Sequence, residues 1–167
     1  MTRKRTFATA VTLLLAVMVA IGAISASAST SSAAKGGGNL LAGAWTVTVN
    51  RPAPLPPLQS LQVFSTKGGV VEMANEAQAS RTPAFGTWER IEGHLYAATA
   101  VFFRFDATGA YVGKQKINRT ILIAPDGQTF THVAQVTVYN AAGVAVTSFV
   151  VRAAGERMQV ERIPDLP

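Results

Sequence analysis

The sequence of 167 residues contains no cysteine. This absence excludes a disulfide framework, a thiolate nucleophile and a lipid attached to cysteine behind a cleavage site. Histidine is almost as scarce, because His94 and His132 are the two in the chain, too few and too unclustered for a metal site. The sequence also has no Gly-x-Ser-x-Gly elbow and no phosphate-binding glycine loop. We therefore expect neither a metal nor a cofactor.

Charge is also sparse, since Asp, Glu, Lys and Arg make up 14% of the residues. The formal net charge is +6, but Arg3, Lys4 and Arg5 lie before a predicted cleavage site. Without them the chain carries 12 basic and 9 acidic residues. No basic run or basic-aromatic stripe remains, so nucleic acid is not an expected partner.

The first residues, 1–28, have the three parts of a secretory signal. A positive start is followed by the mostly apolar segment 7–23 and by Ala26-Ser27-Ala28, a small-residue cleavage pattern. The alternative is a membrane anchor, but the apolar segment is shorter than the roughly 20 residues of a span, and no charge follows to stop transfer. We expect a secreted, periplasmic or extracellular protein that leaves the membrane after cleavage. Residues 29–42 then form a flexible leader, and residues 43–163 form one domain.

That domain shows strand patterns separated by turn residues, and no helical period. The three turns Glu92-Gly93, Asp106 to Gly109 and Pro125 to Gln128 each supply a glycine for a tight hairpin. The predicted strands are 43–50, 58–65, 70–75, 85–91, 95–105, 111–123, 129–139 and 144–154. Short connections between consecutive strands favour an all-β, eight-stranded antiparallel up-and-down barrel over a sandwich. Such a barrel has no free edge, and its interior holds side chains or one small ligand.

The first predicted strand begins with Gly43-Ala44-Trp45. This triplet resembles the Gly-x-Trp signature of lipocalins and the wider calycin superfamily. The later block SRTPAFGTWER…FFRFDATG is similar to that of small secreted bacterial lipocalin-like proteins. The resemblance implies a small apolar or amphiphilic ligand, and a late arginine packed across Trp45 at one closed end. Arg162 is the first candidate for that structural role and Arg157 the second.

Alternation of side chains predicts which of them face the interior. We place the odd positions of 95–105 inside because Arg104 belongs in water, and the odd positions of 111–123 because Lys114 and Lys116 belong there. On 129–139 the even positions, from Phe130 to Val138, face inward. Trp88 is either a second wall of a cavity or a plain buried aromatic. The predicted ligand-binding residues are Trp88, Thr99, Val101, Phe103, Gln115, Ile117, Arg119 and Phe130.

Arg119 is the most costly of these to bury, so it needs an acidic partner, and Glu72 is the strand acid that can reach it. One interpretation is functional: Arg119 binds a carboxylate or polarises a carbonyl, and Glu72 or His132 transfers protons. The other is structural, with Arg119 and Glu72 paired across the barrel.

Two surface features remain open at this stage. The even positions of 95–105, among them Tyr96 and Phe102, predict an outer apolar stripe, which either contacts a second copy in a homodimer or is covered by the leader or a loop. Residues 51–57 contain four prolines, and they form either a plain connection or a lid over a ligand.

Three functions follow as hypotheses. The first is a non-enzymatic barrel that binds a small hydrophobic or amphiphilic molecule. The second is a cofactor-independent cyclase or isomerase, similar to allene oxide cyclases, which accelerates a reaction by positioning its substrate. The third is an inhibitor or adhesion module that acts through its outer loops, and it predicts a packed interior.

Overall fold

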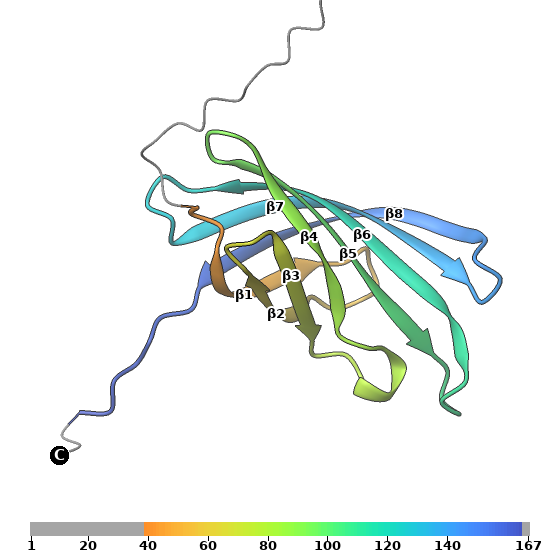
Figure 1. The fold of residues 1–167 in the computed structure, drawn as a ribbon. Coiled ribbons are helices and arrows are strands. Elements are labelled where there is room, and N and C mark those ends of the chain that lie inside the picture. The colour runs from red at the N-terminus through yellow and green to blue at the C-terminus, as the bar shows by residue number, and fades with distance from the viewer. Residues whose placement is uncertain (1–38, 165–167) are drawn as a thin grey trace, which may run out of the picture. The chain divides into compact units, whose positions relative to one another are not determined.

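A computed structural model describes residues 39–164, and these form a closed antiparallel barrel of eight strands in sequence order (Figure 1). The predicted signal 1–28 and most of the leader lie outside the described residues. The predicted fold class is confirmed. The strands are β1 (Gly43–Asn50), β2 (Leu58–Phe64), β3 (Gly69–Ala74), β4 (Ala84–Glu92), β5 (Leu95–Phe105), β6 (Tyr111–Ile123), β7 (Thr129–Asn140) and β8 (Ala145–Arg157).

Closure comes from β1, which pairs with β2 on one side and with β8 on the other. Trp45 is opposite Gln62 of β2 and Arg157 of β8 in these two ladders. Every strand therefore has two hydrogen-bonded neighbours, so neither end of the meander presents a free edge. Strands β5 to β8 are the longest, and Figure 1 shows their ends projecting beyond β1 to β3 on one side of the barrel.

Helical structure is confined, within residues 39–164, to one 3₁₀ turn at Gln78–Ser80, between β3 and β4. The described residues include no helix of the length and apolarity needed to cross a membrane.

The hairpin between β5 and β6 shows how side chains fix the turns. The Asp106 carboxylate accepts hydrogen bonds from the Thr108 hydroxyl at 2.6 Å and from the backbone N–H groups of Thr108 at 2.8 Å and Ala110 at 3.0 Å. These hydrogen bonds lower the pKa of the Asp106 carboxyl below its ordinary value, and the bond from the Thr108 hydroxyl has the largest effect. Gly109 follows at φ +83°, a conformation that favours glycine.

The inward faces predicted for β6 and β7 agree with the burial pattern, in which Ile117, Arg119, Phe130 and His132 are buried. Exposed or half-exposed residues alternate with them. Side chains alternate between the two faces of a strand. Once polar residues identify the outer face, the direction of every other side chain in the strand follows.

On β5 the predicted face was wrong. The buried residues are the even ones, Tyr96, Ala98, Ala100 and Phe102, while Phe103 is 51% exposed. The assignment had relied on Arg104, whose side chain faces the interior near the end of the strand, at the open rim where it still reaches water. The predicted outer stripe of even residues is therefore also wrong, since those residues line the interior.

One end of the barrel is filled by five aromatic side chains, which we call the aromatic plug: Trp45, Phe64, Trp88, Tyr96 and Phe130. Ring centroids lie 4.8 Å apart for Trp45 and Phe130, and 5.8 Å apart for Trp88 and Tyr96. Tilted and edge-on pairs of this kind add about 0.5–1.5 kcal/mol each beyond burial. The plug therefore closes this end with packed rings.

Gly155 of β8 makes room for the plug. A Cβ atom at this position would lie 2.4 Å from Cζ of Phe130, closer than side-chain atoms pack. The Phe130 ring therefore occupies the volume that any other residue at position 155 would need.

The arginine beside Trp45 is Arg157, and the first choice of Arg162 was wrong. Strand β8 continues to Arg157, three residues beyond its predicted end, so this side chain and not the later one lies opposite Trp45. Its guanidinium carbon is 4.3 Å from the indole ring centre. Arg162 follows the last strand and is exposed.

Candidate functional site

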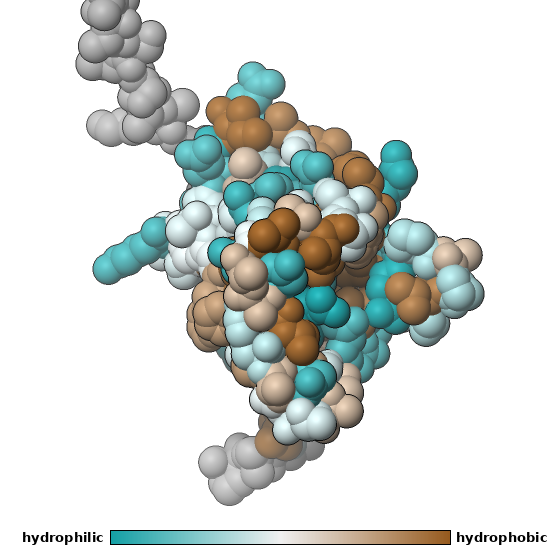
Figure 2. All heavy atoms as spheres, turned by 90° about the vertical axis from the view of Figure 1, so that its right-hand side faces the viewer, coloured by the Kyte–Doolittle hydropathy of each residue, from teal (hydrophilic) through white to brown (hydrophobic). Residues whose placement is uncertain are grey.

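The half of the barrel beyond the plug encloses a cavity of about 380 Å³. Figure 2 shows the molecule from the side where the long strands project, with apolar and polar side chains mixed around a hollow. Exposed Leu55 and Ser80 lie at the mouth, whereas Arg119, His132 and Ala134 at the inner end are buried. The volume falls within the range of about 300–1,000 Å³ that is typical of small-molecule pockets.

The walls of this cavity are largely apolar. They come from seven strands, from the Pro-rich loop 51–57 and from the loop between β3 and β4, and their apolar members are Val49, Pro52, Leu55, Leu58, Phe102, Phe105, Ile117, Ala134, Val136, Val138, Phe149 and Val151. Alternation along β6, β7 and β8 brings these side chains to one side of each strand. The wall can therefore accept an apolar molecule and exclude water from it.

A buried ion pair lies at the inner end of the cavity. Nη2 of Arg119 on β6 donates a hydrogen bond to Oε2 of Glu72 on β3, and their side chains are 2% and 4% exposed. Burial of both charges is tolerated because each satisfies the other across the barrel. The predicted pairing of these two residues is therefore present in the structure.

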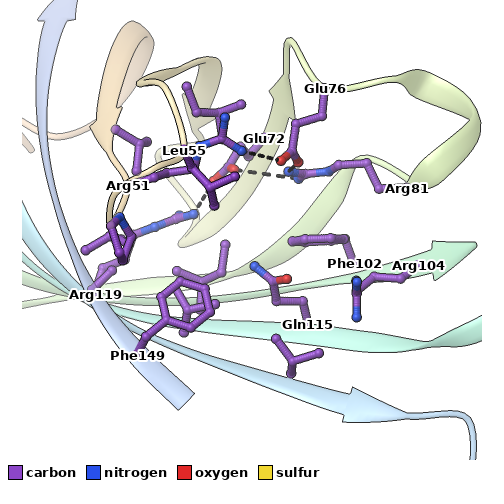
Figure 3. A pocket seen from close by; sticks show the side chains of 18 of the residues that line it. Arg51, Leu55, Glu72, Glu76, Arg81, Phe102, Arg104, Gln115, Arg119 and Phe149 are labelled. Carbon is purple, nitrogen blue, oxygen red and sulfur yellow. Dashed lines mark hydrogen bonds and ion pairs between the residues drawn. The ribbon is translucent and has the colours of Figure 1, made fainter. Parts of the chain in front are cut away.

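The pair extends toward the mouth as a chain of charges, which Figure 3 shows with dashed lines. Nη2 of Arg81 lies 3.6 Å from Oε1 of Glu72, and Nη1 of Arg81 donates to Glu76 at 3.1 Å. Glu76 in turn accepts from Nη1 of Arg51 at 3.1 Å. We call these five residues, Arg51, Glu76, Arg81, Glu72 and Arg119, the ion chain. It connects both loops at the mouth to the floor of the cavity.

Arg81 reaches the interior from the loop between β3 and β4. Its guanidinium carbon is 3.7 Å from the centre of the Phe102 ring, and its side chain is 7% exposed. An arginine over an aromatic face is stabilised by the charge distribution of the ring. The Arg81 side chain therefore helps to anchor the loop to the barrel wall, together with the Thr82 hydroxyl, which accepts a hydrogen bond from the Phe103 N–H at 3.1 Å.

Several buried polar atoms at the floor have no hydrogen-bond partner among residues 39–164. They are Nε and Nη1 of Arg119, Nδ1 of His132 and Oε1 of Gln62. The Gln62 amide donates to Ser60 at 3.1 Å and to Glu72 at 3.4 Å, so only its oxygen is free. Buried donors and acceptors without partners are uncommon in proteins, and each is a place where a bound molecule can supply the missing partner.

His132 lies on top of the aromatic plug, with its ring stacked on Phe130 at 5.9 Å between centroids. Burial lowers the pKa of His132 from 6.5 to about 3, and the positive charge of Arg119 contributes to this shift as the second cause. The imidazole is therefore neutral at pH 7 and has one ring nitrogen able to accept a hydrogen bond.

The structure brings the three candidate catalytic residues Arg119, Glu72 and His132 together in one cavity. Among the predicted ligand-binding residues, Gln115, Ile117 and Arg119 line this cavity. Trp88 and Phe130 belong to the aromatic plug, and Thr99, Val101 and Phe103 are on the outer face of β5.

Trp88 agrees with the simpler of its two interpretations, that of a plain buried aromatic. Its indole N–H donates to the carbonyl groups of Ser65 and Gly69, each at 3.1 Å, and the ring packs between Phe64 and Tyr96. It is a buried aromatic of the closed end and does not line the cavity.

Sequence reasoning missed Arg81, Glu76 and Phe102 as site residues, and it gave no role to Arg51. Phe102 was missed because β5 was assigned the opposite face. Both Arg81 and Glu76 are in a loop, where no period tells which side chains turn inward. A usable signal was the opposite charges of residues 51, 76 and 81 in two loops that the meander brings to one end of the barrel.

A second hollow, of about 530 Å³, lies on the outside of the closed end and is lined by residues of β6 and β7 together with His94. It is an open depression without a cluster of charged side chains, so it does not form a second candidate site. No group of three His, Asp or Glu side chains suited to a metal ion occurs among residues 39–164.

Comparisons of the chain with protein-family models, with curated proteins and with solved structures gave no significant match. What the chain shows by itself is a closed eight-stranded barrel, compatible with a lipocalin-like fold, whose interior has room for a ligand.

Proposed function

We propose that the protein binds a small amphiphilic molecule in the open half of the barrel. The observation that carries this proposal is the cavity of about 380 Å³, with apolar walls around a buried polar floor. The aromatic plug and the Trp45–Arg157 contact hold the opposite end closed, so the cavity has a fixed depth. The third hypothesis, an inhibitor or adhesion module, predicts a packed interior and loses its support.

The Pro-rich loop supports the same proposal. Pro52 and Leu55 line the cavity, and Nε of Arg51 donates to the carbonyl of Pro56 at 2.8 Å, which holds the loop in shape. The loop is thus part of the ligand entrance and agrees with the interpretation as a lid better than with a plain connection.

Native mass spectrometry of the protein purified from its own source tests this function directly. A bound small molecule that is released on denaturation supports the proposal. Fluorescence titration with fatty acids should give saturable binding with one site per barrel. Absence of a bound molecule together with no saturable binding would overturn it.

A second candidate function is a cyclase or isomerase acting on a hydrophobic substrate. The specific observation in its favour is that His132, held neutral, lies in one cavity with Glu72 and Arg119. A neutral imidazole can orient the substrate through a hydrogen bond, and a guanidinium can stabilise the negative charge that develops on an oxygen. Incubation with a conjugated polyene fatty acid should then give an isomer at a rate that His132→Gln abolishes, whereas His94→Gln leaves the rate unchanged.

Secretion is part of this proposal. The predicted signal at residues 1–28 supports it, and N-terminal sequencing of the exported protein tests it. A mature N-terminus close to residue 29 is the expected result, and an uncleaved Met1 would contradict it.

A further inference from the structure

We propose that the ligand is an anionic amphiphile whose carboxylate binds Arg119 at the cavity floor, with its apolar part directed toward the mouth. This inference rests on the proposed function and specifies the chemistry of the ligand's polar end. It follows from the free donors of Arg119, from the charge balance of the ion chain and from the position of the floor relative to the plug.

Arg119 has donors to spare. Its side chain is 2% exposed and its Nη2 group donates to Glu72. Its Nε and Nη1 atoms have no acceptor among residues 39–164. A guanidinium carries five N–H groups in a planar arrangement suited to carboxylate oxygens. A carboxylate at the floor would satisfy donors that Glu72 leaves unused.

The charge balance favours one negative charge. The ion chain contains three arginines, Arg51, Arg81 and Arg119, but two carboxylates, Glu72 and Glu76. Each carboxylate is shared between two guanidinium groups, so one positive charge is uncompensated. His132 adds none, because it is neutral in the folded protein. A monoanion therefore neutralises the chain, whereas a cation would increase its surplus.

The orientation follows from the neighbours of Arg119. Toward the closed end, Ile121 is fully buried in the core, and His132 is stacked on Phe130. Toward the mouth, the walls continue through apolar Ile117, Val136 and Phe149. A head group next to Arg119 has no room for a chain beneath it, so the chain must extend outward along these residues.

The test compares decanoate with decanol by isothermal titration calorimetry at pH 7. The two probes share a chain and differ in the charged head. We expect decanoate to bind at least about tenfold more tightly than decanol, because one or two charge-assisted hydrogen bonds to Arg119 would change the affinity by a factor of this size. Arg119→Gln should remove this preference and leave the affinity for decanol unchanged. Arg152→Gln, on the exposed outer face of β8, is the matched control and should keep the preference.

Each outcome separates the two proposals. Equal affinities for both probes in the unmodified protein would overturn the carboxylate assignment and leave the proposed function standing. Binding of neither probe would overturn both. A preference for decanoate that survives in Arg119→Gln would overturn the floor as the site of the head group. If Arg119→Gln fails to fold, Arg119→Lys keeps the charge beside Glu72 but loses the planar donors, and a reduced preference is expected.

Discussion

Trp45 and Arg157 lie opposite each other on β1 and β8, with the Arg157 guanidinium carbon 4.3 Å from the centre of the indole ring. The indole N–H donates to the carbonyl of Leu41 at 2.9 Å. Nη1 and Nε of Arg157 donate to the carbonyl groups of Ala42 at 2.9 Å and Gly127 at 2.7 Å. One arginine thus joins the start of the first strand, the last strand and the turn before β7.

Replacement of Trp45 by alanine should destabilise the barrel by about 3–5 kcal/mol, because the plug loses one of its two indole rings and a cavity remains. Urea unfolding followed by circular dichroism measures this loss. Phe103→Ala is the matched control, since Phe103 is an aromatic of the outer face that is 51% exposed. Its effect should be small, and a large one would mean that the outer face carries the stability.

Arg157→Met keeps most of the apolar contact with Trp45 but removes the charge and the hydrogen bonds. We expect a loss of about 2–3 kcal/mol in the free energy of unfolding, from the cation–π contact and from carbonyl groups left without donors. Arg162→Met should change stability by less than about 0.5 kcal/mol, as is usual for exposed sites. Equal effects of both substitutions would contradict the assignment of Arg157.

The Glu72–Arg119 pair should respond asymmetrically to mutation. Glu72→Gln leaves Arg119 without an acidic partner, so we expect a loss of about 3–5 kcal/mol in the free energy of unfolding. Arg119→Gln should cost less, because Glu72 retains Arg81 at 3.6 Å. Chemical denaturation of both single variants and of the double variant measures the coupling. A larger loss for Arg119→Gln would show that Arg81 does not compensate Glu72.

Stability should depend on pH through His132. Its pKa is about 3 in the folded protein, while an unfolded chain has the ordinary value near 6.5. Between these values the unfolded state binds more protons, so stability is lost as the pH falls through this window and is complete above it. From pH 7 to pH 5 the free energy of unfolding should fall by about 2 kcal/mol from this group. Urea titrations at the two pH values measure it.

Two histidine variants isolate this contribution. His132→Gln should show a smaller loss between pH 7 and pH 5 than the unmodified protein, whereas His94→Gln should show the same loss. An unchanged pH dependence in His132→Gln would mean that His132 is not held neutral.

A larger side chain in the cavity should weaken ligand binding while the barrel stays folded. Val138 on β7 lines the cavity, and Val133 on the same strand is 46% exposed on the outer face. We expect Val138→Phe to lower the affinity for decanol and decanoate alike, at a cost in stability of about 1–3 kcal/mol from overpacking. Val133→Phe should affect neither property. Undiminished ligand affinity in Val138→Phe would show that the ligand binds elsewhere.

The barrel itself could be predicted because most consecutive strands are joined by short turns and several of them have a clear period. On β6, the polar residues Lys114, Lys116 and Asn118 lie at every second position and mark one face. The opposite face was therefore correctly predicted to point inward. On β5 both faces are largely apolar, and Arg104 was the one charged residue that could mark a face. Because Arg104 is near the open rim, an inward side chain there still reaches water, and the marker indicated the wrong face.

The site was predictable only where it lies on strands. The pairing of Arg119 with Glu72 followed from the cost of burying a lone guanidinium. The contribution of Arg81 depends on the path of the loop between β3 and β4, and loop paths are set by contacts that have no sequence period. The choice between Arg157 and Arg162 depended on where β8 ends, and strand ends are fixed by pairing with a neighbour rather than by the strand's own residues.

The aromatic plug determines which positions of the barrel can accept substitutions. The rings that hold the closed end lie below the space a ligand would occupy, so they are a different set of side chains from the apolar wall around that space, and the Glu72–Arg119 pair at the floor contributes both to stability and to the choice of ligand. Variation at Val136, Val138 or Phe149 can then alter the accepted molecule while the scaffold stays folded, as long as Gly155 keeps the space for Phe130. The open half is therefore the place to introduce new specificities by design or by selection, and the closed half is the part to leave intact.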